Sequence, residues 1–271
     1  MGGRGGGQGN PPAPSHRIRR LKGRFGVICT PLTILEPPPG ETELQMVNTT
    51  EIKAIGIGGI GCALLPFLCR YLQYSGERTR LTLIDGDHFQ QANAPRQAFS
   101  RPGNKAEVKA RELAREFEGI FLRAVPEYVT AANLHHLIRE GDIVFLMVDN
   151  YASRHLVDGY AATLQDLTLI SGGNDYEDGN VQLYLRRAGR DLTPSLGRYH
   201  PEIAQPGDRN PADLSCEELM AAGAPQLLFT NLMVASLMLN AFYTLRHSSP
   251  GYGEVYLDIR QNLCRPVARP I

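Results

Sequence analysis

The stretch Ile52-Lys53-Ala54-Ile55-Gly56-Ile57-Gly58-Gly59-Ile60-Gly61 decides the fold class of this chain. Its apolar first half predicts a buried strand, and its glycines predict a tight turn into a helix. Glycine lets a backbone approach a phosphate closely, and the first turn of a helix offers free N–H groups. We therefore predict that Gly56, Gly58, Gly59 and Gly61 bind a nucleotide. The alternative is that they serve only the turn.

Strand and helix patterns alternate after this turn. Further strands are expected at residues 80–85, 121–129, 142–148 and 167–171, and helices at 60–74, 104–117, 132–139 and 151–165. Alternation with short connections is typical of an α/β fold, a Rossmann-like, mostly parallel sheet with helices on both faces. A strand near 180–186, a long apolar helix at about 226–245 and a terminal strand at 252–258 complete the pattern. We expect the C-terminal strands to be antiparallel. Residues 188–215 show no periodicity, and such a long loop is usually functional or mobile.

Polar side chains follow the second predicted strand. Asp85 ends that strand, where a carboxylate typically accepts a bond from a ribose hydroxyl; alternatively it caps the turn. The chain then presents Asn93, Arg96, Gln97 and Lys105. Hydride transfer does not need this set, whereas nucleotidyl transfer needs cations to neutralise charge that develops on a triphosphate. The residues therefore favour nucleotidyl transfer over an NAD-linked dehydrogenase.

A second carboxylate follows a later strand. Asp149 comes directly after Ile143–Val148, which is apolar enough to be buried on both faces of a sheet. The carboxyl ends of the strands are where open α/β sheets bind ligands. Asp149 is therefore a second candidate site residue. It could also cap the helix that opens at Tyr151.

Taken in order, these motifs resemble those of the ThiF/MoeB/HesA family of adenylating enzymes, relatives of the ubiquitin-activating enzymes. The family carries G-x-G-G-x-G, D-x-D, N-x-x-R-Q, G-x-x-K and a D-N pair. Here the corresponding residues are Gly56 to Gly61, Asp85 and Asp87, Asn93 to Gln97, Gly103 to Lys105, and Asp149-Asn150. The resemblance covers roughly residues 50–268.

The resemblance implies an activity. The chain would use ATP and Mg²⁺ to adenylate the C-terminal carboxylate of a small ubiquitin-like or sulfur-carrier protein, and it would form a homodimer. Arg96 and Lys105 would balance the phosphates and Asp149 would hold magnesium. Asn93, Gln97 and Asn150 would line the nucleotide site. Asp87 would either help to hold magnesium or simply favour its turn. A catalytically silent scaffold of the same family and, less well supported, an NAD-linked oxidoreductase are the alternatives.

The sequence departs from the family pattern in three places. The glycine-to-lysine spacing is one residue short, so Lys109, one helical turn after Lys105, is an alternative phosphate ligand. None of the five cysteines forms a C-x-x-C pair, so we expect no structural zinc. The family's Arg-rich opening segment is not recognisable. Together, the missing zinc cysteines and the diverged N-terminus resemble ThiF proteins of bacterial mobile-element clusters such as the PRTRC system.

Cys216 occupies the position of the family's crossover-loop cysteine. Ser215-Cys216-Glu217-Glu218 matches a capping box, which would place the thiol in the first turn of a helix and lower its pKa. Asp213, Glu217 and Glu218 act in the opposite direction. Cys216 is thus either a catalytic thiol that accepts the acyl group as a thioester or a structural cysteine. Cys62 and Cys69 lie among apolar residues and are expected in the core.

Charge and composition indicate the domain organisation, the partners and the location of the protein. The 271 residues carry no formal net charge, but residues 1–35 hold six basic residues and no acid. We expect a disordered basic extension at residues 1–24, a strand or loop segment at 25–50 and the adenylation domain at 51–271. Nucleic-acid binding is not indicated. The 226–245 region contains Asn231, Ser236 and Asn240, which favours a buried helix over a membrane span. Five cysteines without evident pairing suggest the cytoplasm.

Overall fold

The computed structural model describes residues 2, 49–215, 218 and 226–271. Residues 1–24, nearly all of 25–50, and Cys216 lie outside this part of the chain, so the predictions made for them stay predictions.

Strands and helices alternate through the described residues. In chain order they are β1 (Thr50–Ile55), α2 (Gly59–Tyr74), β2 (Thr79–Ile84), β3 (His88–Phe89), η1 (Gln91–Asn93), β4 (Gly103–Asn104), α3 (Lys105–Glu116), β5 (Phe121–Val125), α4 (Leu134–Leu137), β6 (Ile143–Leu146), α5 (Tyr151–Ala161), β7 (Leu167–Asn174), β8 (Asp178–Arg187), β9 (Arg190–Asp191), η2 (Leu196–Arg198), α6 (Pro201–Ala204), η3 (Pro211–Asp213), α8 (Leu228–His247), β10 (Glu254–Asp258) and β11 (Leu263–Val267).

The large sheet has the strand order β11-β10-β8-β7-β6-β1-β2-β5, with β9 added to β8. Strands β7, β6, β1, β2 and β5 pair in parallel, and β7-β8, β8-β10 and β10-β11 pair antiparallel. The expected fold class is therefore confirmed. The chain runs from β1 outward to β2 and β5, then returns to the other side of β1 with β6. The switch point lies between β1 and β6, where folds of this kind bind ligands.

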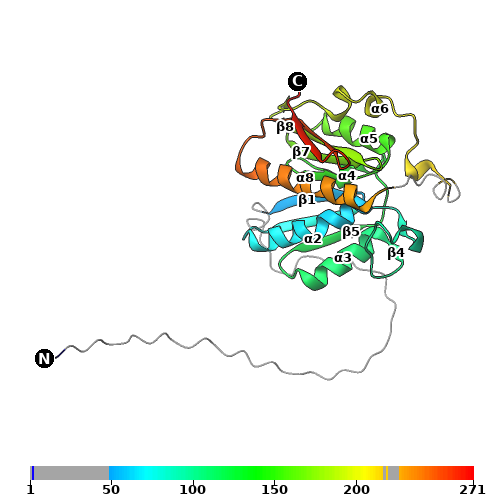
Figure 1. Ribbon diagram of the computed structural model, residues 1–271, viewed down its shortest axis with the longest axis vertical. Helices are drawn as coiled ribbons and strands as arrows, with labels where there is room; N and C mark the ends of the chain where they lie inside the picture. Colours follow the sequence, from blue (N-terminus) through cyan, green and yellow to red (C-terminus); the bar gives the residue numbers. More distant parts are fainter. Residues whose placement is uncertain (1, 3–48, 216–217, 219–225) are drawn as a thin grey trace. The chain divides into compact units, whose positions relative to one another are not determined.

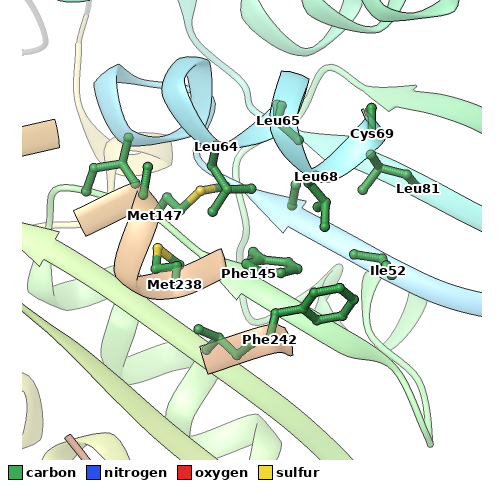
Figure 2. Packing of buried hydrophobic residues seen from close by; sticks show 14 of the residues in the cluster. Ile52, Leu64, Leu65, Leu68, Cys69, Leu81, Phe145, Met147, Met238 and Phe242 are labelled. Carbon is green, nitrogen blue, oxygen red and sulfur yellow. The ribbon is translucent and has the colours of Figure 1, made fainter. Parts of the chain in front are cut away.

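Two apolar layers hold the helices on the sheet. Figure 1 shows α8, α2 and α3 side by side over one face. Figure 2 shows how that layer is built: Leu64, Leu65 and Leu68 from α2 and Phe242 from α8 pack near Phe145 of β6. The other layer, under α4 and α5, contains Val144, Leu146 and Val157. The period of apolar residues along each helix fixes which face it turns to the sheet.

Short or exposed elements account for the differences from the sequence predictions. The ladder between β3 and β4 has two residue pairs, too few for an alternating pattern. The terminal strand β10 is followed by β11, which is mostly exposed and carries Pro266, as suits an edge strand. The expected loop at 188–215 contains β9, η2, α6 and η3. Helix α4 spans only Leu134–Leu137, half the length that its pattern indicated.

Helix α8 is the one helix in the described part of the chain that is long and apolar enough to cross a membrane, and 39% of its apolar window is buried. A core helix of a soluble protein passes the same test. Here Val234, Met238 and Phe242 pack into the layer described above.

A polar cluster, which we call the His200 corner, lies where β8, β10 and α6 meet. We define it by His200, Glu202, Glu254 and Arg269. His200 lies between the two glutamates, with Nδ1 2.9 Å from Glu202 and Nε2 2.7 Å from Glu254. Glu254 is 1% exposed and also accepts a bond from Arg269 Nε at 2.8 Å. Each charge in this corner thus has an opposite partner.

Candidate active site

The carboxyl ends of β1, β2 and β6 bring the predicted motifs together. The glycine turn follows β1, the Asp85–Asp87 turn follows β2, and Val148-Asp149-Asn150 follows β6. Since these three strands are neighbours in the order β6-β1-β2, the three turns share one edge of the sheet. Three of the predicted motifs therefore meet at the switch point.

Close packing requires most of the turn glycines. Gly56 has a φ of +88°, and a Cβ there would lie 2.8 Å from the Met147 carbonyl. A Cβ on Gly61 would meet the Gly56 oxygen at 2.7 Å, and one on Gly59 would overlap the Asn231 amide. Gly58 differs, since the nearest atom to its Cβ position is Gln97 Nε2 at 3.9 Å. Glycine is therefore required by packing at three positions of the turn, and the fourth position, Gly58, leaves room for a ligand.

Asp85 holds the glycine turn in shape. Its carboxylate accepts hydrogen bonds from the backbone N–H of Ile57 at 2.6 Å and of Asp87 at 2.8 Å. Burial raises the pKa of Asp85, although Lys105 acts in the opposite direction. This is the turn-capping alternative considered above. A carboxylate has further lone pairs, so a bond to a ribose hydroxyl remains a compatible prediction.

Lys105 lies among carboxylates at the start of α3. Its side chain is 8% exposed and forms an ion pair with Asp87. Burial lowers its pKa, but the nearby Asp85, Asp87 and Asp149 outweigh burial and raise it. Asn104 fixes this arrangement, since its Nδ2 donates to the backbone carbonyl of Asp85 at 2.8 Å and its Oδ1 accepts from the Glu107 N–H, which caps α3. Lys105 is thus a buried cation at the edge of the sheet that carries the three turns after β1, β2 and β6, which we call the ligand edge.

Lys109, the alternative to Lys105, serves the adjoining loop. Its ammonium donates to the Ala98 carbonyl and to Glu112, the latter at 2.6 Å, and lies 4.6 Å from the centre of the Phe99 ring. These contacts hold residues 98–100 against α3. Lys109 therefore stabilises this loop, whereas Lys105 lies near Asp85, Asp87 and Asp149.

The 93–97 loop places unpaired polar atoms beside the turn. The backbone carbonyl of Asn93 accepts from Arg96 N–H at 3.0 Å and Gln97 N–H at 2.9 Å. Arg96 Nε and Gln97 Oε1 are buried and have no hydrogen-bond partner within the described residues. Helix α2 also begins there without a side-chain cap. Unpaired donors, a free helix N-terminus and the room at Gly58 fit a nucleotide phosphate.

Asp149 and Asn150 have different surroundings. Asn150 is the N-cap of α5, with Oδ1 2.8 Å from Ser153 N–H, and Asp208 accepts from the next two backbone N–H groups. Asp149 does not cap this helix, so that alternative reading is wrong. Asp149 is exposed at the ligand edge. No cluster of three metal-ligating side chains occurs in the described ranges, but magnesium on a nucleotide commonly takes one or two carboxylates and phosphate oxygens.

Sequence reasoning missed three residues of this edge. Arg154 is 5% exposed and donates to the carbonyls of Val148 at 2.6 Å and Gly172 at 2.7 Å, which ties the Asp149 turn to β7. Asn104, followed by Glu107, carries a recognisable helix-cap pattern that could have been found. Asn231 gives no local signal because it enters the site from α8.

Comparison with known proteins shows the family of this chain. The ThiF family model matches residues 33–249. The "NEDD8-activating enzyme E1 catalytic subunit" of Caenorhabditis elegans is 27% identical over 70% of this chain and 45% of that protein. The "Sulfur carrier protein adenylyltransferase" of Thermus thermophilus is 24% identical over 74% of this chain and 73% of that protein. The chain spans less than half the length of the first relative.

A solved structure shares the fold. Escherichia coli MccB, whose structure was determined with ATP, superposes with a TM-score of 0.63 at 19% identity. The match covers 82% of this chain and 65% of MccB. At this identity the likeness concerns the fold.

Proposed function

Because the chain belongs to the ThiF family, we propose that it is an adenylating enzyme which activates the C-terminal carboxylate of a small ubiquitin-like or sulfur-carrier protein with ATP. The observation that carries the proposal is the buried Lys105 among the carboxylates that follow β2 and β6, with Gln97, whose Oε1 is unpaired within the described residues, beside Gly58 of the glycine turn. The names of the relatives support the reaction class. A catalytically silent scaffold that binds nucleotide could keep the same residues, and pyrophosphate exchange separates it from an active enzyme.

The proposed reaction is nucleotidyl transfer. An oxygen of the partner's terminal carboxylate attacks the α-phosphorus of ATP, the bond from that phosphorus to the bridging oxygen breaks, and pyrophosphate leaves. An acyl adenylate results. Lys105 and Arg96 would neutralise charge on the phosphates, and the first turn of α2 would donate N–H groups to them. Asp149 would hold magnesium, which supplies further charge neutralisation when bound.

Several finer features belong to the same proposal. The apolar side chains Phe229, Leu232 and Met233 are exposed on α8. An exposed apolar patch marks an interaction surface, so we assign it to the homodimer contact. The mass of the protein in solution tests this assignment.

The Cys216 thiolate would attack the carbonyl of the acyl adenylate, the bond from that carbonyl to the phosphate oxygen would break, and AMP would leave, so that Cys216 holds the acyl group as a thioester. The reaction would take place in the cytoplasm.

The test is ATP–pyrophosphate exchange with candidate C-terminal peptides and proteins. The wild-type chain is expected to exchange label, and Asp149→Ala to lose exchange by about 10³-fold while keeping its circular dichroism spectrum, because one ligand to the metal at a triphosphate is gone. Exposed Asp178 supplies a matched control, Asp178→Ala. If Asp149→Ala exchanges within about threefold of wild type, its assignment is wrong.

A further inference from the structure

Asn231 is a fully buried amide that has no hydrogen-bond partner among the described residues. It lies in the first turn of α8 and is 0% exposed. Neither its Nδ2 nor its Oδ1 has a hydrogen-bond partner within the described ranges. Both atoms lie against Gly59, the first residue of α2, as the overlap with a Cβ built there shows. The amide is thus aimed at the N-terminal turn of the helix at the proposed site.

Two residues with unpaired buried atoms lie against this turn, Gln97 beside Gly58 and Asn231 beside Gly59. Eight buried side-chain nitrogen or oxygen atoms lack partners in the described part of the chain, and four of them belong to Arg96, Gln97 and Asn231. Leaving a buried donor or acceptor unpaired is unfavourable, so native chains rarely keep such groups without a use. By contrast, the buried Asn104 amide is paired at both ends. The two amides that are unpaired and lie against this turn, Gln97 and Asn231, are therefore candidate ligand contacts.

The chemistry of the amide selects the ligand group. Phosphate and carboxylate oxygens only accept hydrogen bonds, so they could pair with Nδ2 but would leave Oδ1 unpaired. A peptide group offers one N–H and one carbonyl, which match both atoms of an asparagine amide. The proposed substrate is a protein C-terminus, whose last peptide group directly precedes the reacting carboxylate.

We propose that Asn231 binds the last peptide group of the incoming C-terminal tail and so sets the carboxylate beside the first turn of α2. This inference rests on the proposed function for its substrate class. Asn231 would then be a specificity residue that favours peptide carboxylates over simple carboxylic acids. Because its amide is fully enclosed, the tail displaces neighbouring atoms when it binds.

Two matched probes test the contact. Acetyl-triglycine carries the last peptide N–H, and its ester analogue has an oxygen in that place. Binding of each to the full chain is measured calorimetrically with a non-hydrolysable ATP analogue present. The wild type is expected to bind the amide about 10-fold more tightly than the ester, because the ester leaves Oδ1 unpaired. Asn231→Leu should bind both equally and about as weakly as the wild type binds the ester.

Controls separate contact from structure. Asn240→Leu, an exposed position on the same helix, should keep the preference for the amide. Asn231→Ala serves if Asn231→Leu does not fold. The inference is overturned if the Asn231 variants keep the amide preference, if they lose both probes and ATP together, or if the wild type does not bind the amide or prefers the ester. Failure of the proposed function would appear separately, as absent pyrophosphate exchange.

Discussion

The ligand edge of the sheet and the His200 corner both bury charged side chains, yet they pair them differently. In the corner, His200 lies between Glu202 and Glu254, and Arg269 completes the set. At the edge, Lys105 faces more carboxylate charge than it neutralises, and Arg96 Nε has no partner in the described part of the chain. A polar cluster whose charged and hydrogen-bonding groups all have partners stabilises the fold. A cluster that leaves such groups unpaired is suited to bind a ligand. Pairing separates the two regions better than burial does.

The largest expected effect tests whether the edge is the reactive region. Lys105→Met should lower ATP–pyrophosphate exchange by about 10³-fold and weaken ATP more than AMP, since only ATP presents the outer phosphates. Lys109→Met should lower the melting temperature, because Lys109 holds the 98–100 loop, and should leave exchange by the folded protein within about threefold. Exchange rates and nucleotide affinities measure both.

The opposite result would reverse the assignment. If Lys109→Met abolishes exchange and Lys105→Met does not, the phosphate ligand is Lys109 and the register across the shortened glycine-to-lysine spacing is wrong.

A smaller effect tests whether the corner is only structural. The hydrogen bond to Glu254 raises the pKa of His200, so protonated His200 stabilises the folded state. This contribution is complete below the ordinary histidine pKa of about 6.5 and is lost as the pH rises through the raised value. His200→Gln should lower the melting temperature by roughly 2–6 °C at pH 5.5, with a smaller difference at pH 8.5.

Thermal melts of both proteins across this range give the comparison. Exchange activity, measured at a temperature where both are folded, should not change. A His200→Gln variant that is fully stable but inactive would show that the His200 corner belongs to the active site.

The smallest expected effect tests whether the unpaired groups at the sheet edge arise because the glycine turn opens readily. Burial raises the pKa of Cys62 to about 11 and that of Cys69 to about 12. Cys62, under the glycine turn, also contacts the Ala98 carbonyl at 3.6 Å. Iodoacetamide at pH 8 should leave both thiols unmodified in the native protein and label exposed Cys264, as read by peptide mass spectrometry. Rapid labelling of Cys62 would show that the turn opens by itself.

Much of this could be predicted from the sequence, because strand-turn-helix patterns are local. The parallel sheet and the glycine turn follow from residues near one another in the chain. The meeting of Asp85, Lys105 and Asp149 follows from the rule that open α/β sheets bind ligands at the carboxyl ends of their strands, and from the family resemblance. Contacts between distant segments could not be predicted in this way. Asp208 caps α5 from a segment without periodicity, and Asn231 reaches Gly59 from a helix that starts more than 160 residues later.

Gly56 carries a consequence for how the protein acquires its site. The turn after β1 is in contact with the backbone that leaves β6, at Met147 and Val148. β6 can pair with β1 only after the intervening residues, 56–142, have been synthesised. A nascent chain that stops before β6 therefore has the glycine motif but lacks the surface that shapes it. Parallel pairing of distant strands is slow. Nucleotide affinity should thus appear late in folding and report completion of the central sheet.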